Sequence, residues 1–519
     1  MFNISKRTLS LIISILIVAL IISILIYLVK VNPVYKTIWD KIKTYLGIIL
    51  TIYSIFIATV IFLENKNPSK TIAWLLILIL VPVVGFIFYI FLGHNIRRKM
   101  KFEKKKYSDF KHLTYAVDIQ KELLKGTDIF KNVEESLVKS KLINLLLKVS
   151  NSPFTSNNRT KILKNGDETF KHIIDEIKNA KHHIHMEYFI IKDDDIGNKI
   201  REILIGKAKE GVKVRVIYDD VGCWRLSKNY INSLKASGVE IYPFYPVIFP
   251  VLSRELNYRN HRKIVVVDGR VGFIGGLNIG DEYLGLNPRL GFWRDTHIKI
   301  EGEAVYGIQN TFLKDWEFVS GKYISGKSYY PKLPYYGEQI IQITPSGPDT
   351  EWRSIMKAYF TMIATAEERV WIATPYLVPE DSINTALMTA ALSGIDVRII
   401  IPSKPDHILV YWASRSNIED LLKAGVKIYT YEKGFIHSKL LLVDGEVASV
   451  GTANLDIRSL EMNFEINSFI YDKEVVKELE KDFIEDLSHS KEVILEEHLK
   501  RNILVKFKES IGRLLSPLL

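Results

Sequence analysis

Cysteine is almost absent from this sequence of 519 residues, which contains a single one, Cys223. One cysteine cannot form an intramolecular disulfide, and it cannot build a metal cluster of the kind that several cysteines share. Both sorts of cross-link within the chain are therefore excluded. The lack of disulfides also fits a reducing compartment.

Acidic residues are in the minority, with 59 against 70 lysines and arginines, which gives a formal net charge of +11. A basic excess fits an anionic partner, and a membrane surface, a nucleic acid or a phosphate-bearing substrate would each serve. Hydrophobic residues make up 47% of the chain, and the mean hydropathy is slightly positive at +0.07. Since soluble proteins of this length are usually more polar, part of the chain is expected to lie in lipid.

Long apolar runs with almost no charge occupy the first hundred residues. They cover 9–29, 46–63 and 71–92, and each is close to the roughly 20 residues that a helix needs to cross a bilayer. One such run could be a buried core helix, but three in succession predict a membrane region over 1–106. The first run is longer than a usual signal-peptide core and no small-residue cleavage site follows it, so it is interpreted as a retained span.

The loops between these runs differ in basic charge, which sets orientation. Seven of the ten residues in 97–106 are lysine or arginine, and such a cluster is expected to stay in the cytoplasm. The sequence therefore predicts a multi-pass protein of the cell membrane whose remaining chain, with any active site on it, lies on the cytoplasmic side.

Beyond residue 160, short β-rich runs alternate with amphipathic helices, and the pattern occurs twice. A helix that closes at Gly211 leads into a predicted strand at 212–218, and a helix that closes at Gly394 leads into one at 397–401. Two such units predict an α/β fold made of two similar halves. The expected boundaries are 107–160 for a juxtamembrane helical connector, 161–330 for the first half, 331–495 for the second half and 496–519 for a basic amphipathic C-terminal helix.

One motif, H-x-K-x4-D-G, stands in both halves. Its residues are, in chain order, His261, Lys263, Asp268, His437, Lys439 and Asp444. Each copy is followed by a turn of small residues and an asparagine, Asn278 or Asn454. Because residues two apart on a strand face the same side, we expect each histidine and lysine to share one face of a strand. The apolar run between lysine and aspartate would continue that strand into the core and end it at the Asp-Gly turn.

This pairing of residue types suits chemistry at phosphorus. Lysine and asparagine donate hydrogen bonds to phosphate oxygens. One histidine can attack phosphorus and form a covalent intermediate, while a second can protonate the leaving alcohol and later deprotonate the acceptor. A single H-x-K is usually an ordinary exposed strand face. Two copies inside a wider repeat favour one catalytic site, which the fold must assemble from motifs 176 residues apart.

At these residues the sequence resembles the phospholipase D superfamily, whose signature is a pair of H-x-K-x4-D motifs, and the resemblance covers the chain from about 160 to its C-terminus. Further segments look like bacterial cardiolipin synthases. They are WRDTH at 293–297, SGPD at 346–349, TPYLVP at 374–379 and, near the membrane, NPSKTIAWLL at 67–76. The last resembles the start of the second helix of that family's membrane hairpin, so the run at 9–29 is an additional span.

The resemblance implies a phosphohistidine intermediate, no metal, no cofactor and one site shared by the two halves, lined by both motifs with Asn278 and Asn454. It implies that Asp268 and Asp444 are structural members of the motif. The implied reaction converts two phosphatidylglycerols into cardiolipin and glycerol. We take His261 as the nucleophile and His437 as the acid and base as a hypothesis, because the sequence does not break the symmetry between them.

A catalytic imidazole needs its other nitrogen held. The candidates are Asp295 after the first motif and Glu465 after the second, with a surface or structural acid as the equal alternative. The cluster of His182, His183 and His185 could in principle bind a metal, but a solvated or helix-capping role is favoured.

The expected partners are phosphatidylglycerol and other anionic phospholipids, with no nucleic acid. The C-terminal helix could lie on an anionic membrane or pack on the catalytic domain. Other functions remain open: hydrolysis or head-group exchange with another acceptor, a membrane-tethered nuclease, and a lipid-binding scaffold without activity. Two intact motifs speak against the scaffold, and the lack of a basic-aromatic nucleic-acid module speaks against the nuclease.

Overall fold

The computed structural model describes residues 33–63, 72, 75–78, 137–247 and 258–516. The chain divides into two compact units, Met1–Ile96 and Arg97–Leu519. The second unit contains both copies of the motif.

The first unit contains one long described helix, α2 (Pro33–Leu63). It includes the predicted span 46–63 but begins earlier, with a segment that carries Lys36 and Asp40. The predicted span 9–29 lies outside the described residues, as does most of 71–92. Across the described part of the chain, no helix combines the length and the apolarity that a membrane crossing demands.

The first half of the second unit is built on a seven-stranded mixed sheet in the order β2-β9-β7-β6-β3-β4-β5. Its strands are β2 (Asn158–Lys164), β3 (His183–Tyr188), β4 (Lys213–Asp219), β5 (Glu240–Phe244), β6 (Ile264–Val267), β7 (Val271–Gly275) and β9 (Thr296–Gly302). Its helices are α8 (Asn165–Asn179), α9 (Asp195–Lys209), α10 (Lys228–Ala236) and α11 (Ala304–Ser320).

The second half repeats this sheet as β10-β19-β17-β16-β11-β13-β14 and adds β1 (Phe154–Thr155) and β20 (Ser490–Glu492) at the two edges. Its strands are β10 (Ile341–Ser346), β11 (Arg369–Ala373), β13 (Asp396–Pro402), β14 (Lys427–Tyr431), β16 (Leu440–Val443), β17 (Val447–Gly451) and β19 (Glu465–Ile470). Its helices are α12 (Ser354–Ala364), α13 (Asp381–Leu392), α14 (Ile408–Arg415), α15 (Ile418–Lys423), α16 (Ile457–Glu461) and α17 (Lys473–Ser488).

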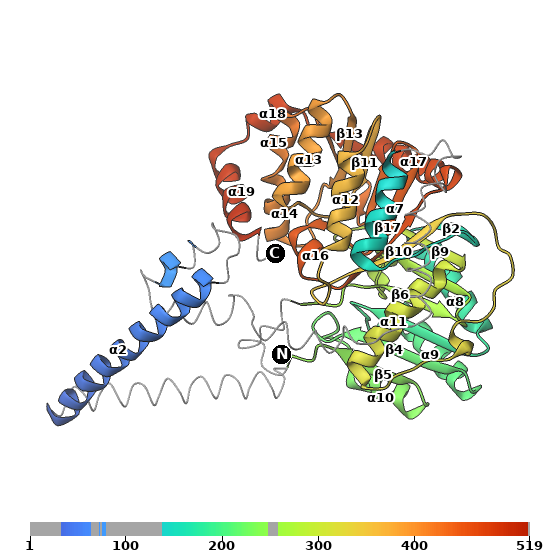
Figure 1. Cartoon of the computed structure of the whole chain (residues 1–519), viewed down its shortest axis with the longest axis horizontal. Coiled ribbons are helices and arrows are strands. Elements are labelled where there is room, and N and C mark those ends of the chain that lie inside the picture. Colours follow the sequence, from blue (N-terminus) through green and yellow to red (C-terminus); the bar gives the residue numbers. More distant parts are fainter. Residues whose placement is uncertain (1–32, 64–71, 73–74, 79–136, 248–257, 517–519) are drawn as a thin grey trace. The chain divides into compact units, whose positions relative to one another are not determined.

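The shared strand order confirms the predicted pair of α/β halves, which Figure 1 shows one above the other. The helix ends behave as expected, since α9 and α13 are each followed two residues later by a glycine with positive φ, +89° at Gly211 and +93° at Gly394. Within 107–160 the described elements are α7 (Leu137–Ser150), β1 and the beginning of β2. Near the C-terminus, α18 (Leu495–Leu499) and α19 (Ile503–Leu515) are the last elements among the described residues.

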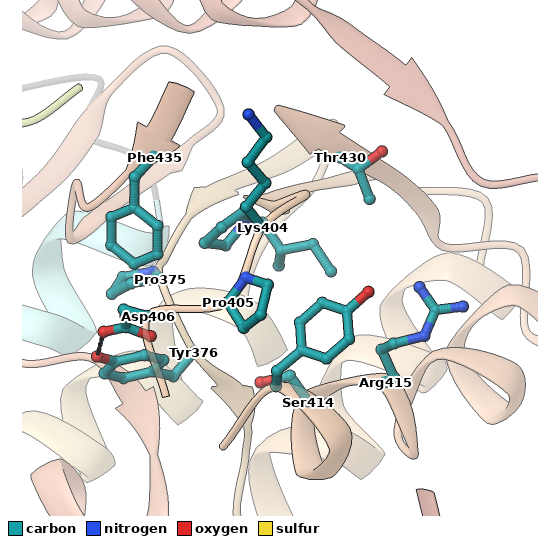
Figure 2. A pocket seen from close by; sticks show the side chains of 12 residues that line it. Pro375, Tyr376, Lys404, Pro405, Asp406, Ser414, Arg415, Thr430 and Phe435 are labelled. Atoms are coloured by element: carbon teal, nitrogen blue, oxygen red, sulfur yellow. Dashed lines mark hydrogen bonds between the residues drawn. The ribbon is translucent and has the colours of Figure 1, made fainter. Parts of the chain in front are cut away.

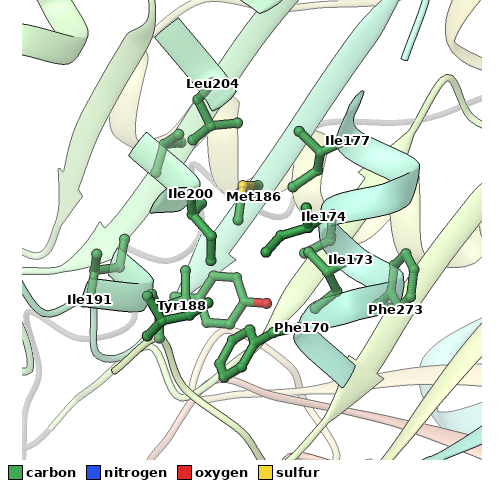
Figure 3. Close-up of a cluster of buried hydrophobic side chains, with 14 of the residues drawn as sticks. Phe170, Ile173, Ile174, Ile177, Met186, Tyr188, Ile191, Ile200, Leu204 and Phe273 are labelled. Carbon is green, nitrogen blue, oxygen red and sulfur yellow. The ribbon is translucent and has the colours of Figure 1, made fainter. Parts of the chain in front are cut away.

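Each half has its own apolar core between its sheet and the helices on one face. In the first half, α8 contributes Phe170 and Ile174, and α9 contributes Ile200 and Leu204, which meet Met186 of β3 (Figure 3). The two residues of each helix are four positions apart, which places them on one side of that helix. The amphipathic pattern seen in the sequence is thus what attaches the helices to the sheet.

A third cluster of buried side chains joins the halves, because it draws on both sheets. It contains Ile264, Val266 and Ile298 from the first half, and Leu440 and Ile466 from the second. Burying apolar side chains from both halves together stabilises their docking. The shared core lies next to β6 and β16, the strands that carry the apolar runs of the two motifs.

Candidate active site

The sequence predicted that the two motif histidines lie within strands. In the structure they lie instead in extended segments just before those strands. The strand β6 begins at Ile264, one residue after Lys263, and β16 begins at Leu440, one residue after Lys439. The reason is that each segment pairs with the opposite half instead of with its own sheet.

This crossed pairing occurs twice and in the same way. The short strand β15 (Gly434–Ile436) runs parallel to β8 (Phe292–Arg294) of the first half, and the N–H of His437 donates to the carbonyl of Arg294 at 2.7 Å. In the mirror arrangement the N–H of His261 donates to the carbonyl of Phe464 in the second half at 2.9 Å. Both histidines are thereby fixed at the junction of the halves.

The side chains follow the backbone across the junction. The imidazole Nδ1 of His437 lies 2.7 Å from Oδ2 of Asp295, and Nδ1 of His261 lies 3.0 Å from the Glu465 carboxylate. Both carboxyl groups are fully buried. Each half therefore supplies one histidine and the acid that contacts the histidine of the other half.

The lysines of the motif are buried beside the histidines. Nζ of Lys263 donates to the carbonyl of His261 at 2.7 Å, and Nζ of Lys439 donates to the carbonyl of His437 at 2.6 Å. Nζ of Lys439 is also 3.0 Å from Nδ1 of His437. One nitrogen cannot both accept from an ammonium and donate to a carboxylate. The shorter contact, to Asp295, assigns the Nδ1 proton and leaves Nε2 free for chemistry.

Burial governs the protonation of this cluster, because it disfavours every charged form. It lowers the pKa of both imidazoles well below the ordinary value, so both are neutral in the free site. Burial raises the pKa of Asp295 to about 7, although the charge of Lys439 lowers it. Burial likewise raises the pKa of Glu465 to about 8, although the charge of Lys263 lowers it. A neutral imidazole is the form that can attack phosphorus.

Burial also shifts the two motif lysines toward their uncharged form. Burial lowers the pKa of Lys439 to about 8, although the Asp295 carboxyl favours the ammonium, and it lowers the pKa of Lys263 well below its ordinary value. Two lysines and two carboxyl groups thus share one enclosed space, where their opposite charges stabilise one another. An anionic phosphate entering this space would favour the charged lysines.

Aromatic rings fix the orientation of the imidazoles. The ring of Trp293 lies 5.1 Å from that of His437, and Phe189 meets the edge of His261 at 5.2 Å between ring centres. Packing of this kind restricts rotation of the histidines about their side-chain bonds. In the sequence, Trp293 stands out only within the WRDTH segment, and no local pattern marks Phe189.

The two asparagines behave differently from each other. Asn278 accepts from the N–H of Ile190 at 3.1 Å and donates to the hydroxyl of Tyr283 at 3.0 Å. The side-chain oxygen of Asn454 is buried with no hydrogen-bond partner among the described residues. Both side chains are almost fully buried, so the structure does not show them as freely presented donors.

Asp268 and Asp444 lie at the far end of the motif strands and hold loops. The Asp268 carboxylate accepts from the N–H groups of Lys181, His182 and His183 at 2.7 to 2.9 Å. The Asp444 carboxylate does the same for the three residues 367–369, at 2.8 to 2.9 Å.

Each of these aspartates also begins a tight turn. The φ values are +53° and +66° at Asp268 and Gly269, and +55° and +68° at Asp444 and Gly445. Two successive residues with positive φ are what a type I′ turn requires. The Asp-Gly pair thus closes the hairpin after each motif strand, with the aspartate seven residues after the histidine.

Ion pairs around the site were not predicted. Nε of Arg294, next to Asp295, donates to Asp486 of the second half at 2.7 Å, and both side chains are buried. Arg262, between the two motif residues, pairs with Asp315. The signals available in the sequence were the Trp-Arg-Asp segment at 293–295 and the Asp-Trp pair at 315–316, but neither reveals its partner.

The cluster of His182, His183 and His185 was expected to be solvated or helix-capping, and this was wrong for two of the three. His183 and His185 are fully buried, and the His185 ring stacks on Phe312 at 4.4 Å. The side chains of β3 point inward here because α11 covers that face of the sheet. Among the described residues, no group of three or more His, Cys, Asp or Glu side chains is arranged to hold a metal.

A pocket in the second half lies beside His437. Figure 2 shows Tyr376 hydrogen-bonded to Asp406 on one side of it, and Lys404 and Arg415 on the other. Phe435, which lines the pocket, has its ring 6.1 Å from that of His437. The pocket is therefore a neighbour of the catalytic cluster.

Two similar α/β halves that meet at a crossed pair of histidines define the phospholipase D-like class of phosphoryl-transfer proteins. The family model described as "Cardiolipin synthase, PLD-like domain" matches residues 173–316 and 359–487, and "Phospholipase_D-nuclease N-terminal" matches 49–94. The chain belongs to the cardiolipin synthase family.

Individual relatives agree. The chain is 49% identical to cardiolipin synthase 2 of Bacillus anthracis over 84% of each protein. It is 45% identical to the major cardiolipin synthase of Bacillus subtilis, over 84% of this chain and 91% of that one. The crystal structure of phosphatidylserine synthase from Haemophilus influenzae superposes with a TM-score of 0.55 at 18% identity, covering 72% of this chain and 96% of that one. The last match shows a common fold.

Proposed function

We propose that this chain is a phosphatidyltransferase that makes cardiolipin and glycerol from two molecules of phosphatidylglycerol. The observation that carries the proposal is the crossed pair of contacts, His437 to Asp295 and His261 to Glu465. Two oriented imidazoles in one buried, lysine-rich space are what a two-step transfer through a covalent intermediate needs. Membership of the cardiolipin synthase family supports the choice of substrate.

In the first step, Nε2 of His261 attacks the phosphorus of one phosphatidylglycerol. A P–N bond forms, and the P–O bond to the head-group glycerol breaks. His437 gives a proton to the departing glycerol oxygen, so that glycerol leaves as a neutral alcohol. His437 must carry a proton on both nitrogens to do this. The neutral ring of the free site takes up its second proton, on Nε2, from solvent when the anionic phosphate binds, because a nearby negative charge favours the protonated form. The Asp295 carboxylate, 2.7 Å from Nδ1, then offsets the charge of the protonated ring.

In the second step, the head-group hydroxyl of another phosphatidylglycerol gives its proton to Nε2 of His437. Its oxygen attacks phosphorus, the P–N bond breaks, and His261 is restored as a neutral imidazole. The product is cardiolipin. The assignment of His261 as nucleophile stays a hypothesis, since the crossed contacts are alike on both sides.

The buried ammonium groups of Lys263 and Lys439 serve the phosphate oxygens in this scheme. One residue stands between each lysine and its histidine, and the lysine ammonium already donates to the histidine carbonyl. Its remaining protons are available to a phosphate. Asn278 and Asn454 would complete the cradle. Asp268 and Asp444 take the structural part, supported by their three backbone hydrogen bonds each.

The setting that we propose is the cell membrane, with 1–106 as the membrane region and the catalytic halves on the cytoplasmic side. The basic run at 97–106 supports this orientation, and the family match over 49–94 supports a common N-terminal region with relatives. Phosphatidylglycerol and other anionic phospholipids are then partners as well as substrates.

Product analysis tests the proposal. The full chain in mixed micelles of detergent and phosphatidylglycerol, with chelator present, is compared with His261→Ala and His437→Ala. Cardiolipin and glycerol in equal amounts from the unmodified chain alone are expected. Phosphatidic acid in their place would mean that water is the acceptor, and no turnover of any phospholipid would overturn the lipid assignment.

A further inference from the structure

The C-terminal helix α19 is attached to the second half by a specific interface with α14. Gly512 meets the backbone of Ala413 so closely that a Cβ there would lie 2.5 Å from the Ala413 nitrogen. Lys508 lies over the ring of Trp412 at 5.2 Å. A close approach of this kind requires glycine at the crossing point, so α19 is held in a defined position on the domain.

Buried polar contacts secure the same face. Glu509 is almost fully buried and accepts from Nε of Arg501 at 2.7 Å and from Nε of Arg415 at 3.4 Å. Arg501 also donates to Glu419 of α15 at 2.8 Å. The face of α19 that contacts the second half therefore contains Glu509 and Gly512. The large apolar side chains of α19 are not part of this contact face.

Those large apolar residues point the other way. Ile503 is 78% exposed and Leu514 is 79% exposed. The remaining members of this set are also exposed: Leu504, Phe507 and Ile511. At about 100° per residue the five fall within an arc of about 100°, and Glu509 and Gly512 lie on the other side of the helix. We call these five residues the apolar face of α19.

Because α19 is already docked through its other side, packing on its own domain does not account for this exposed apolar face. Ile408 and Leu409, at the start of the adjoining helix α14, are exposed as well. Figure 1 shows α19 and α14 together on the outside of the second half.

The charges beside the apolar face have one sign. Lys506 and Lys508 are exposed on either side of it, and Lys500 precedes the helix. The only acid within α19 is Glu509, which is buried and paired. An apolar stripe flanked by lysines is complementary to a bilayer that contains anionic lipid: the stripe enters the acyl boundary and the lysines meet the phosphates.

The position of α14 connects this face to the catalytic cluster. Tyr411, Ser414 and Arg415 of α14 line the pocket beside His437, while Trp412 and Ala413 carry α19. One helix therefore holds α19 and also lines the pocket, where Figure 2 shows Ser414 and Arg415.

We propose that the apolar face of α19, with Ile408 and Leu409, docks the second half onto the surface of a bilayer containing anionic phospholipid. This docking is separate from any membrane-crossing segment and brings the pocket next to His437 to the level of the lipid head groups. Phosphatidylglycerol could then reach the histidines without leaving the bilayer.

A fluorescence experiment on the full chain tests the docking, and it does not depend on the proposed function. The chain has one cysteine, Cys223, which is buried, so Phe507→Cys can be labelled with a polarity-sensitive dye. The matched control is Leu392→Cys on α13, whose native side chain is 74% exposed. Both are reconstituted in vesicles of phosphatidylcholine with phosphatidylserine and in vesicles of phosphatidylcholine alone.

The dye at 507 is expected to shift to the blue and to be quenched by a nitroxide on the lipid acyl chain, and the dye at 392 to show neither effect. The shift is expected to be smaller without phosphatidylserine. An aqueous signal at 507, or a blue shift that the lipid nitroxide does not quench, would overturn the proposal. The latter would mean that protein covers the face. An equal shift in both vesicles would overturn the preference for anionic lipid.

An activity experiment adds a second readout and rests on the proposed function. The double variant Leu504→Asp, Phe507→Asp is compared with Leu392→Asp. The double variant is expected to lose activity several-fold on phosphatidylglycerol in vesicles and to keep it on a short-chain, monomeric phosphatidylglycerol. Equal loss on both substrates would show that the face serves folding, which contradicts the proposal. If no chain has activity, the proposed function fails, while the fluorescence result still decides the docking.

Discussion

Asp295 and His437 are 142 residues apart in the chain, and their Oδ2 and Nδ1 atoms are 2.7 Å apart. The contact crosses between the halves, and Glu465 makes the equivalent contact with His261. Catalysis at either histidine should therefore depend on an acid in the opposite half.

Asp295→Asn tests this dependence. An amide can present its NH2 group to Nδ1 and so favour the wrong imidazole tautomer, and it cannot offset the charge of a protonated ring. By analogy with other histidine–carboxylate pairs, kcat is expected to fall by about 10²–10⁴-fold with a smaller change in KM. Steady-state cardiolipin formation measures both.

The matched control is Asp175→Asn on α8 of the same half, which should retain activity. A thermal unfolding scan separates lost catalysis from lost folding. Wild-type kcat in a folded Asp295→Asn chain would contradict the role of Asp295 in positioning His437.

The roles of the two histidines can be separated by trapping. With phosphatidylglycerol labelled in its phosphatidyl part, the chain carrying His437→Ala is expected to accumulate a covalent lipid adduct. The adduct should form slowly, because the departing glycerol has lost its proton donor, and it should persist, because acceptor activation is lost. The His261→Ala chain should remain unlabelled. Acid-labile label on denaturing gels is the measurement, and label only on the His261→Ala chain would reverse the assignment.

Stability should depend on pH through Glu465, whose pKa burial raises to about 8 from 4.5. Between these values the folded chain keeps a proton that the unfolded chain has lost, so this group makes the free energy of unfolding fall as pH rises. Glu465→Gln cannot titrate. The Tm of the variant relative to wild type is therefore expected to rise from pH 5 to pH 8.

Differential scanning fluorimetry in detergent at several pH values checks this prediction, and Glu497→Gln on α18 controls for the loss of one negative charge. A Tm difference that stays constant across the range would show that Glu465 titrates near its ordinary value.

Asp268 should matter for stability more than for chemistry. Replacing it with alanine removes the acceptor for three backbone N–H groups and leaves a residue that disfavours the positive φ of the turn, at a cost of about 2–4 kcal/mol in unfolding free energy. Asp268→Asn keeps an acceptor and tolerates the conformation, so its cost should be smaller. Chemical denaturation measures both. Equal effects of the two variants would mean that the carboxylate bonds contribute little.

Much of the fold of the second unit could be predicted, because the signals for its elements lie within short stretches of sequence. The glycines after α9 and α13, the Asp-Gly turns and the alternating strands are short-range signals, and all three are repeated. The paired α/β halves follow from that repeat. The strand assignment of His261 and His437 failed because a strand pattern does not say which sheet a segment will join, and these segments pair with the opposite half.

Other features could not be predicted because their partners are distant. Nothing near Arg294 points to Asp486, and nothing near His183 reveals that α11 will bury it. Asp295 and Glu465 could be proposed only from the general need of an imidazole for a second partner. The sequence also could not say which acid would serve which histidine.

The crossed pairing has a consequence for the timing of synthesis. When the ribosome has completed the first half, His261 has no carboxylate, and Asp295 has no imidazole to hold. Asp295 can meet His437 only after the chain has reached residue 437, and His261 can meet its acid only after the chain has reached Glu465. A nascent or truncated chain should thus be chemically silent even if its first half folds, which would keep an unfinished enzyme from acting on the lipids around it.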